Sequence, residues 1–528
     1  MRVTIAMESQ APVPDVDKLR AIIEKLAQRG VRLWAGNGAL RYSAPPGVLE
    51  NIDVAILREH REPLLEILQS EGADWPAYTA SLGQRSMWAR HFLAASQAEG
   101  KDCSFNLLPV VSLNDEVNVE TIKQAVERAV ARHEVLRTRY EIQFGVLWQR
   151  VLDTLEIKIE LINLGDVDED TVTATILNFG RAAFDIANGP CFRVAIFEWR
   201  KAGSGRERLL AFCAHHIAVD HGSLQNLLEE IAQWVLRKKD PPQASQYRSF
   251  AAHQLSLISN DLVQSRVSEL RSKLLPLPTA PDLKWRESRS PSIEERYPLI
   301  SWSLTGRQEK KLRELKDSLG LSLFGICLGL YALVIARISD QSDILINVAA
   351  TLRRPEDGAN AIGNFTNIVP LLAKITIDGG IRDNLVVLYK QASDALVDRE
   401  IPFSMLVEAM GLSGSKARSP LSLITFSWHR EPDGDRGYGL GVLHPISRQM
   451  GPSGAMMLTG RESRGHVDFK LTYDRGSLCD KYAELVSQSM QVAVSLLCEC
   501  PEALVRDVVF PLCEESPFGA REITLTPS

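Results

Sequence analysis

Residues 215–223 read HHIAVDHGS, two adjacent histidines after the apolar run LLAFCA, then an aspartate and a third histidine. Adjacent side chains on a strand point to opposite faces, so His215 and His216 cannot both face one ion there. This argues against a metal site and leaves two interpretations. The histidines are either hydrogen-bonded in a core, or one imidazole is exposed to a cleft, where its pKa of about 6.5 suits acid–base chemistry.

The composition of the 528-residue chain limits the classes of function. The net charge is −6 and the lysines and arginines are scattered, so no basic surface for nucleic acid is expected. No apolar run reaches the roughly 18 to 20 residues that cross a bilayer, and no secretory leader is recognisable. The eight cysteines form no CxxC pair or zinc-type spacing. We therefore expect a cytoplasmic protein with no metal, no nucleic-acid partner and no membrane association.

Three regions of different periodicity follow one another along the chain. Residues 1–72 combine helical stretches with two short apolar runs joined by an Asn-Gly pair, which predicts a helix-hairpin-helix-helix domain. Residues 77–270 and 285–512 alternate strand-like and helix-like segments and predict two α/β lobes of similar size. Residues 513–528 carry no periodicity and are expected to be a linker.

Further motifs surround the histidine stretch. HHIAVDHGS resembles the HHxxxDG signature of the condensation domains of nonribosomal peptide synthetases, which have the chloramphenicol-acetyltransferase-like fold. Four further stretches resemble other motifs of the family and follow one another in the family's order. They are SLGQRSMW (81–88), RHEVLRTRY (132–140), IGNFTNIVPL (362–371) and RSPLSLITFSW (418–428). So many matches in order make a chance resemblance remote. The N-terminal stretch RGVRLWAGNGALRYSAPPGVL is similar to the small docking domains that begin subunits of bacterial synthetases.

The resemblance implies an α/β fold in which two chloramphenicol-acetyltransferase-like lobes form a V around a central tunnel, behind a small α+β docking domain. It implies amide formation between a donor acyl or peptidyl thioester and the amine of an acceptor aminoacyl thioester. Both substrates would arrive on the phosphopantetheine arms of carrier proteins, with no cofactor bound by the chain itself. The implied partners are the donor and acceptor carrier proteins and, through the docking domain, an upstream synthetase or polyketide synthase subunit.

The resemblance also implies roles for individual residues. His216 would face the tunnel as the catalytic residue, taking the proton of the amine or holding the tetrahedral intermediate. Asp220 would pair with an arginine, by family position Arg353, although Arg354 is adjacent. The residues with implied structural roles are His215, Asp220, Arg132 and Arg353. The residues expected along the substrate tunnel are His221, Gly222, Ser223 and Asn367.

Two departures from the family pattern bear on substrate choice. His221 stands where the family usually has glycine, and GAMMLTG (454–460) replaces a string in which an aspartate is common. The His221 ring is expected either beside the donor path or turned toward solvent or the Asp220 side of the loop. Ester formation and epimerisation are alternatives on the same scaffold. A non-catalytic platform that recruits partner enzymes is a third alternative, against which the intact histidine pair argues.

Overall fold

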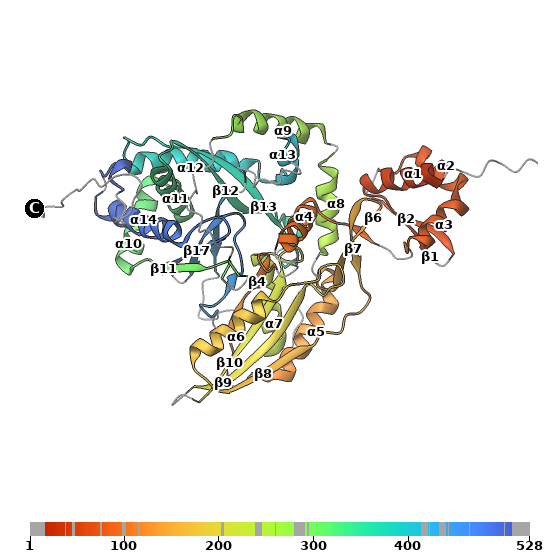
Figure 1. Ribbon diagram of the computed structural model, residues 1–528, viewed down its shortest axis with the longest axis horizontal. Coiled ribbons are helices and arrows are strands. Elements are labelled where there is room, and N and C mark those ends of the chain that lie inside the picture. Colours follow the sequence, from red (N-terminus) through yellow and green to blue (C-terminus); the bar gives the residue numbers. More distant parts are fainter. Residues whose placement is uncertain are drawn as a thin grey trace, which may run out of the picture.

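The computed structural model describes residues 16–508 apart from residues 37, 45–47, 74–76, 98–101, 115–116, 202–204, 238–244, 259, 279–290, 293–294, 359, 413–420, 422, 432–439, 442, 464 and 501. The expected linker at 513–528, the expected start of the second lobe at 285 and the beginning of the RSPLSLITFSW motif lie outside the described residues. A small domain and two larger lobes follow one another along the chain, and the lobes diverge from a shared central region (Figure 1).

The N-terminal domain has the predicted helix-hairpin-helix-helix order. Its elements are α1 (Val16–Gln28), β1 (Arg32–Gly36), β2 (Ala39–Ser43), α2 (Asn51–Glu59) and α3 (Arg61–Ser70). Leu19 and Ile23, at helical spacing on α1, are buried in its core. Gly38 turns the hairpin with a φ of +72°, a conformation that favours glycine. The domain rests on the first lobe, where the guanidinium carbon of Arg32 lies 5.2 Å from the ring centre of Trp148.

The first lobe is built on a sheet whose central strand is the apolar run that precedes the two histidines. The strand order is β15-β4-β10-β9-β8, with β5 also paired to β10, and a smaller sheet has the order β3-β7-β6. The strands are β3 (Tyr78–Thr79), β4 (Asn106–Leu108), β5 (Val110–Ser112), β6 (Thr138–Gln143), β7 (Val146–Val151), β8 (Ile159–Asp166), β9 (Phe192–Lys201), β10 (Gly205–His215) and, from the second lobe, β15 (Arg448–Gln449).

Helices cover this sheet, and the last of them in the chain lies beside the second lobe (Figure 1). They are α4 (Leu82–Gln97), α5 (Val119–Arg132), the short 3-10 helix η1 (Glu134–Arg137), α6 (Glu169–Arg181), α7 (His221–Arg237), α8 (Tyr247–Ser256) and α9 (Asp261–Leu274). Residues 208–215 of β10 are all buried, so this strand is covered on both faces. His216 follows directly after β10, and α7 begins five residues later. The histidine stretch is therefore a strand-to-helix loop at the end of a rigid central strand.

The second lobe contains a mixed six-stranded sheet of order β11-β17-β16-β14-β12-β13. Its strands are β11 (Leu299–Ser303), β12 (Asp343–Thr351), β13 (Thr366–Lys374), β14 (Ile424–Arg430), β16 (Met456–Ser463) and β17 (His466–Tyr473). Its helices are α10 (Gly306–Leu319), α11 (Leu323–Ser339), η2 (Pro355–Asp357), α12 (Ile381–Val397), α13 (Phe403–Ala409), α14 (Asp480–Glu499) and η4 (Val505–Asp507).

Helix α11 is the most apolar helix of the second lobe and lies in its core, with residues 325–336 all buried. Among the described helices, none is by itself both long and apolar enough to cross a membrane. The pair α10 and α11, bent by 101° between them, meets the length and composition criteria only when taken together.

The second-lobe sheet has one apolar and one polar face. Phe426 of β14, together with Phe469 and Leu471 of β17, is buried in the core beneath the helices. Ser427 and Lys470 alternate with these residues, and side chains along a strand alternate between faces, so they lie on the opposite face. This polar face of the second-lobe sheet is turned toward the first lobe.

Residues 443–450, the crossover segment, carry the chain of the second lobe onto the sheet of the first. Its strand β15 pairs with β4. The Val110 N–H donates to Ser447 Oγ at 2.9 Å, and the Met450 N–H donates to the Asn106 carbonyl oxygen at 2.8 Å. Backbone hydrogen bonds thus connect the two lobes on one side of the space between them.

Candidate active site

A cavity of about 550 Å³ lies between the two lobes. Its first-lobe wall includes His216, Asp220, His221, Gly222 and the first turns of α7. Its second-lobe wall is the polar face of the second-lobe sheet, and the crossover segment closes one side. A space of this size holds a small-molecule substrate.

His215 belongs to the core beneath the cavity. Its Nδ1 accepts the Ile217 N–H at 3.1 Å, so the proton of the neutral ring lies on Nε2, which is 3.1 Å from Nδ1 of His91. The ring also packs against Phe105 and Phe184. Burial holds the pKa of His215 well below its usual value, and the nearby His91 and His216 lower it further. His215 is a neutral packing residue that supports the loop.

His216 takes the opposite side and lines the cavity with a partly exposed ring. Its backbone N–H donates to the Phe105 carbonyl oxygen at 2.8 Å, which holds the residue at the strand end. Burial lowers the pKa of the imidazole, Asp220 partly opposes this, and Arg90 adds to the lowering. The ring is therefore neutral at neutral pH and able to accept a proton.

Asp220 holds the loop mainly through backbone amides. Its Oδ1 accepts the Ser223 N–H at 2.7 Å and its Oδ2 accepts the Phe365 N–H at 2.9 Å. The predicted ion pair is looser, since Arg353 Nη2 lies 3.9 Å from Oδ1. The adjacent Arg354 pairs instead with Asp357, at 2.8 Å. Of the two arginines that the sequence left open, Arg353 is the one beside Asp220.

Ser223 is buried beneath the loop. Its Oγ donates to the Gly363 carbonyl oxygen at 2.6 Å and accepts the Gly363 N–H at 3.1 Å and Nη2 of Arg353 at 3.0 Å. This hydroxyl joins the first lobe to the second, and the described cavity wall does not include it. All the polar capacity of this hydroxyl is used inside the protein.

The side chain of Asn367 likewise forms hydrogen bonds with backbone groups, and it is not part of the described lining of the cavity. Its Nδ2 donates to the carbonyl oxygens of Arg399 and Ile401 at 2.8 and 2.7 Å, and its Oδ1 accepts the Phe403 N–H at 3.1 Å. Asn367 therefore ties β13 to the segment between α12 and α13.

Arg132 and its neighbour His133 lie at the contact between α5 and α7. Nε of Arg132 is 3.4 Å from one carboxylate oxygen of Glu230, and Nε2 of His133 is 2.9 Å from the other. His133 is buried, so the shared carboxylate pairs polar groups within the first lobe. The structure thus places Arg132 beside Glu230 of α7.

His221 lies in the cavity wall at the start of α7. Its ring centre is 4.0 Å from that of His429 on β14, and Nε2 of His429 is 3.1 Å from Ser427 Oγ. Burial lowers the pKa of His221 well below its usual value and lowers that of His429 to about 4. Of the two orientations considered from sequence, the structure has the ring beside the cavity. Gly222, next to it, is exposed on the same wall.

The sequence pointed to part of the second-lobe wall, since Met457 and Thr459 of the GAMMLTG stretch line the cavity, but not to the charged and histidine side chains there. His429, Arg461 and Lys470 all line the cavity, yet they come from three strands and belong to no motif. The available signal was the alternation of polar and apolar residues along β14, β16 and β17, which marks one face of a sheet for a polar environment. That signal does not reveal what the face is turned toward.

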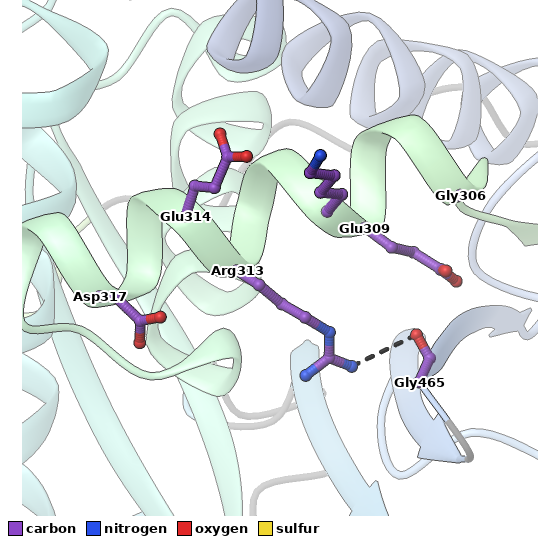
Figure 2. Close-up of a pocket in the computed structure, with 7 residues that line it drawn as sticks. Gly306, Glu309, Arg313, Glu314, Asp317 and Gly465 are labelled. Carbon is purple, nitrogen blue, oxygen red and sulfur yellow. Dashed lines mark hydrogen bonds between the residues drawn. The ribbon is translucent and has the colours of Figure 1, made fainter.

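A second concavity, of about 400 Å³, lies beside α10. Several of its charged residues interact with neighbouring side chains or with the backbone, as Figure 2 shows for Arg313, which donates to the Gly465 carbonyl oxygen at 3.3 Å. Arg313 also lies 3.2 Å from Glu462, and Glu309 accepts the Val467 N–H at 2.9 Å. Within the described parts of the chain, no three histidine, cysteine, aspartate or glutamate side chains are arranged to hold a metal ion. The cavity between the lobes is the candidate active site.

Comparison with protein families agrees with this geometry. The model of the condensation domain family matches residues 77–436, more than half of the chain. The chain belongs to the condensation domain family. The model of the TubC N-terminal docking domain matches residues 20–70, which contain the helix-hairpin-helix-helix unit. The recognition made from the motifs is thereby confirmed for both parts.

Similar curated proteins are nonribosomal peptide synthetases. Tyrocidine synthase 2 of Brevibacillus parabrevis is 25% identical over 369 residues, which cover 70% of this chain and 10% of that protein. Surfactin synthase subunit 1 of Bacillus subtilis (strain 168) is 25% identical over 403 residues, which cover 75% of this chain and 11% of that protein. The matched part thus spans about a tenth of the length of these relatives.

Solved structures share the fold of this condensation domain. The condensation domain from monacolin K polyketide synthase MokA has a TM-score of 0.70 and 16% identity, covering 81% of this chain and 99% of that one. The X-domain from teicoplanin biosynthesis has a TM-score of 0.68 and 18% identity, covering 82% and 97%. The expected two-lobed α/β fold of the chloramphenicol-acetyltransferase-like type is confirmed.

Proposed function

We propose that this condensation domain forms an amide bond between a donor acyl or peptidyl thioester and the amine of an acceptor aminoacyl thioester. Both substrates are carried on phosphopantetheine arms of partner carrier proteins, in nonribosomal peptide or hybrid polyketide–peptide biosynthesis. The observation that carries the proposal is the position of His216, a neutral imidazole at a rigid strand end facing the cavity between the lobes. Family membership supplies the reaction class.

The reaction needs one proton transfer in addition to alignment. The amine nitrogen attacks the thioester carbonyl carbon and gives a tetrahedral intermediate with a negatively charged oxygen. His216 takes the proton from the nitrogen and returns it to the sulfur as the C–S bond breaks, so the donor arm leaves as a thiol. An α-amine has a pKa of about 8, so a fraction is already neutral, and alignment of the two arms provides a large part of the acceleration.

The loop around His216 supplies that alignment. Asp220 uses both carboxylate oxygens to hold backbone amides on the loop and on the second lobe. Ser223 and Arg353 connect the same two chain segments. We therefore assign Asp220, Ser223 and Arg353 as positioning residues and His216 as the only catalytic residue proposed for the loop.

Reconstitution tests the proposal. A donor carrier loaded with an acyl or peptidyl group is mixed with an acceptor carrier loaded with an amino acid, and the mass of the acceptor is measured in a single turnover. We expect the acceptor to gain the mass of the donor acyl group. His216→Ala should slow this by at least about 100-fold, the lower range for loss of a general base, with an unchanged melting temperature.

The matched control is His466→Ala, since His466 has 71% of its side chain exposed on the hairpin between β16 and β17. This variant should retain the full rate. A near-full rate for His216→Ala would refute the catalytic assignment. An ester with a hydroxy acceptor, or an inverted α-carbon without acyl transfer, would assign one of the sibling reactions instead.

We further propose that the docking domain, within residues 1–72, binds an upstream synthetase or polyketide synthase subunit and takes no part in the chemistry. Its distance in sequence from the histidine loop and its match to a docking family support this. Deleting it should weaken capture of the donor carrier through lost effective concentration and leave the rate at saturating carrier unchanged. Loss of turnover at every carrier concentration would assign the segment to the catalytic fold.

A further inference from the structure

We propose that the cavity between the lobes selects a substrate that bears a carboxylate, and that Lys470 and Arg448 bind this carboxylate. The inference rests on the proposed amide-forming function and deepens it, because it names the class of acyl or aminoacyl group that the domain accepts. The carboxylate is a second group on that substrate, separate from the reacting thioester.

The first argument is the charge of the wall. Two carboxylates face the described cavity, Asp220 and Asp468. The cationic side chains on the same lining are Arg353, Arg430, Arg448, Arg461 and Lys470. Excess positive charge in a partly buried space costs free energy unless an anion or polar groups compensate it. The lining thus has the opposite charge to a carboxylate substrate.

The second argument is which cations already have an anionic partner. Arg461 lies 3.3 Å from Asp468 and 3.3 Å from Glu431, and Arg353 lies beside Asp220. Among the described residues, neither Lys470 nor Arg448 forms an ion pair. The hydrogen bonds of Lys470 and Arg448 are instead donated to neutral carbonyl oxygens.

Nζ of Lys470 donates to the carbonyl oxygens of Pro445 and Ser447 at 2.8 and 2.6 Å. Nη2 of Arg448 donates to the carbonyl oxygen of Tyr297 at 2.6 Å. An ammonium has three donors, so Lys470 keeps one beyond these two bonds, and a guanidinium has five. The carbonyl bonds fix the positions of both cations, and among the described residues no carboxylate lies within ion-pair distance of either; Asp468 and Glu431 act on Lys470 only from farther away.

Burial makes this charge sensitive to an added anion. Burial first, then Arg461 and Arg448, lower the pKa of Lys470 to about 8, and Asp468 and Glu431 oppose this only in part. Burial also lowers the pKa of Arg448 to about 10. Both groups remain mainly protonated at neutral pH, and a bound carboxylate would favour their charged forms. Charge-assisted hydrogen bonds of this kind are stronger than bonds between neutral groups.

The sheet register locates the cations relative to the imidazoles. His429 is aligned with Arg461 across β14 and β16, and Lys470 is aligned with Thr459, the next cavity-facing residue on β16. Neighbouring strands are about 4.8 Å apart, so Lys470 lies roughly 10 Å across the wall from β14. The bound carboxylate is therefore placed two strands away from the strand of His429 and belongs to a side chain or to the far end of an acyl chain.

The phosphate of a phosphopantetheine arm offers related anionic chemistry, and the experiment separates the two sources. The probes are N-acetylcysteamine thioesters, which contain no phosphate. N-acetylglutamyl and N-acetylglutaminyl thioesters represent the donor, and glutamyl and glutaminyl thioesters represent the acceptor. Within each pair, carboxylate and amide have the same shape, so a difference in calorimetric affinity reports charge.

We expect one glutamyl thioester to bind the full chain at least tenfold more tightly than its glutaminyl counterpart. Lys470→Gln should reduce this ratio to less than threefold, and Lys470→Arg should restore it. Arg313→Gln, on α10 beside the other concavity, is the matched control and should leave the ratio unchanged. If Lys470→Gln does not fold, Arg448→Gln replaces it with the same expected loss.

Equal affinity for glutamyl and glutaminyl thioesters in both pairs would overturn the proposal. A ratio that survives Lys470→Gln and Arg448→Gln would also overturn it. A third outcome would also count against the proposal. If Lys470→Gln weakens binding only of carrier-bound substrates, and weakens glutamyl and glutaminyl substrates equally, the cations bind the phosphate of the arm and the proposal is wrong. Because binding is measured without turnover, selective binding with no amide product would refute the proposed function alone.

Discussion

The two walls of the cavity hold their polar side chains in different ways. On the first-lobe wall, Asp220 and Ser223 use their hydrogen-bonding capacity mainly on backbone groups, whereas the imidazoles of His216 and His221 face the cavity. On the second-lobe wall, Lys470 and Arg461 extend from strands whose backbone is already paired. A loop needs its side chains to keep its shape, whereas a sheet does not. We therefore expect substitutions on the first wall to affect the fold and the reaction, and those on the second to affect selectivity.

The largest expected effect comes from removing the loop carboxylate. Asp220→Ala leaves two buried N–H groups without their acceptor and Arg353 without its counter-charge, so it should lower the free energy of unfolding by about 3 to 5 kcal/mol. Chemical denaturation measures this. The control on the second wall is Asp468→Ala, whose side chain is 25% exposed. Its cost should stay within about 1 kcal/mol, as for exposed ion pairs. Equal costs would remove the contrast between the walls.

The imidazoles of His221 and His429 are in contact at a tilted angle, join the two walls and should make the protein acid-labile. The pKa of His429 is about 4 in the folded chain against 6.5 for an ordinary histidine. The unfolded chain therefore binds the proton first, so the stability from this group is present above pH 6.5 and is lost as the pH falls through 4. The loss is at most about 3 kcal/mol, at about 1.4 kcal/mol per pKa unit.

Denaturation at several pH values measures this effect. His429→Gln should flatten the decline in stability between pH 6.5 and pH 4. His466→Gln, which alters an exposed histidine, should leave the pH profile unchanged. If the pH profile of stability of His429→Gln coincides with that of the unaltered protein, His429 makes no contribution to the loss of stability in acid.

The smallest expected effect is on donor choice. His221→Gly removes a ring from the cavity wall, and steric selection of this kind is worth roughly 1 to 3 kcal/mol. Amide formation with the natural pair should stay within about tenfold, while bulkier donors improve, in a competition assay read by mass spectrometry. A loss as large as that of His216→Ala would make His221 a second catalytic group and place catalysis on more than one residue of the loop.

Local patterns in the sequence predicted the parts of this protein that depend on neighbouring residues. Alternation along a strand separated His215 from His216, and the structure has one ring in the core and the other at the cavity. Helical spacing and an Asn-Gly pair predicted the N-terminal domain. These features depend on backbone geometry within a few residues. They can therefore be predicted from the sequence without knowledge of the fold.

Only the tertiary structure decided what each side chain meets. Asp220 binds the amide of Phe365, 145 residues away, and the His221 ring lies on His429 of another lobe. Ser223 and Asn367, expected along the tunnel, form hydrogen bonds with backbone groups that are distant in the sequence. The sequence by itself determined the family, the order of the elements in the N-terminal domain and, through the family resemblance, the histidine expected to face a cleft. The packing of the two lobes decided the charge of the opposite wall, because residues from separate strands become neighbours only when the sheet forms.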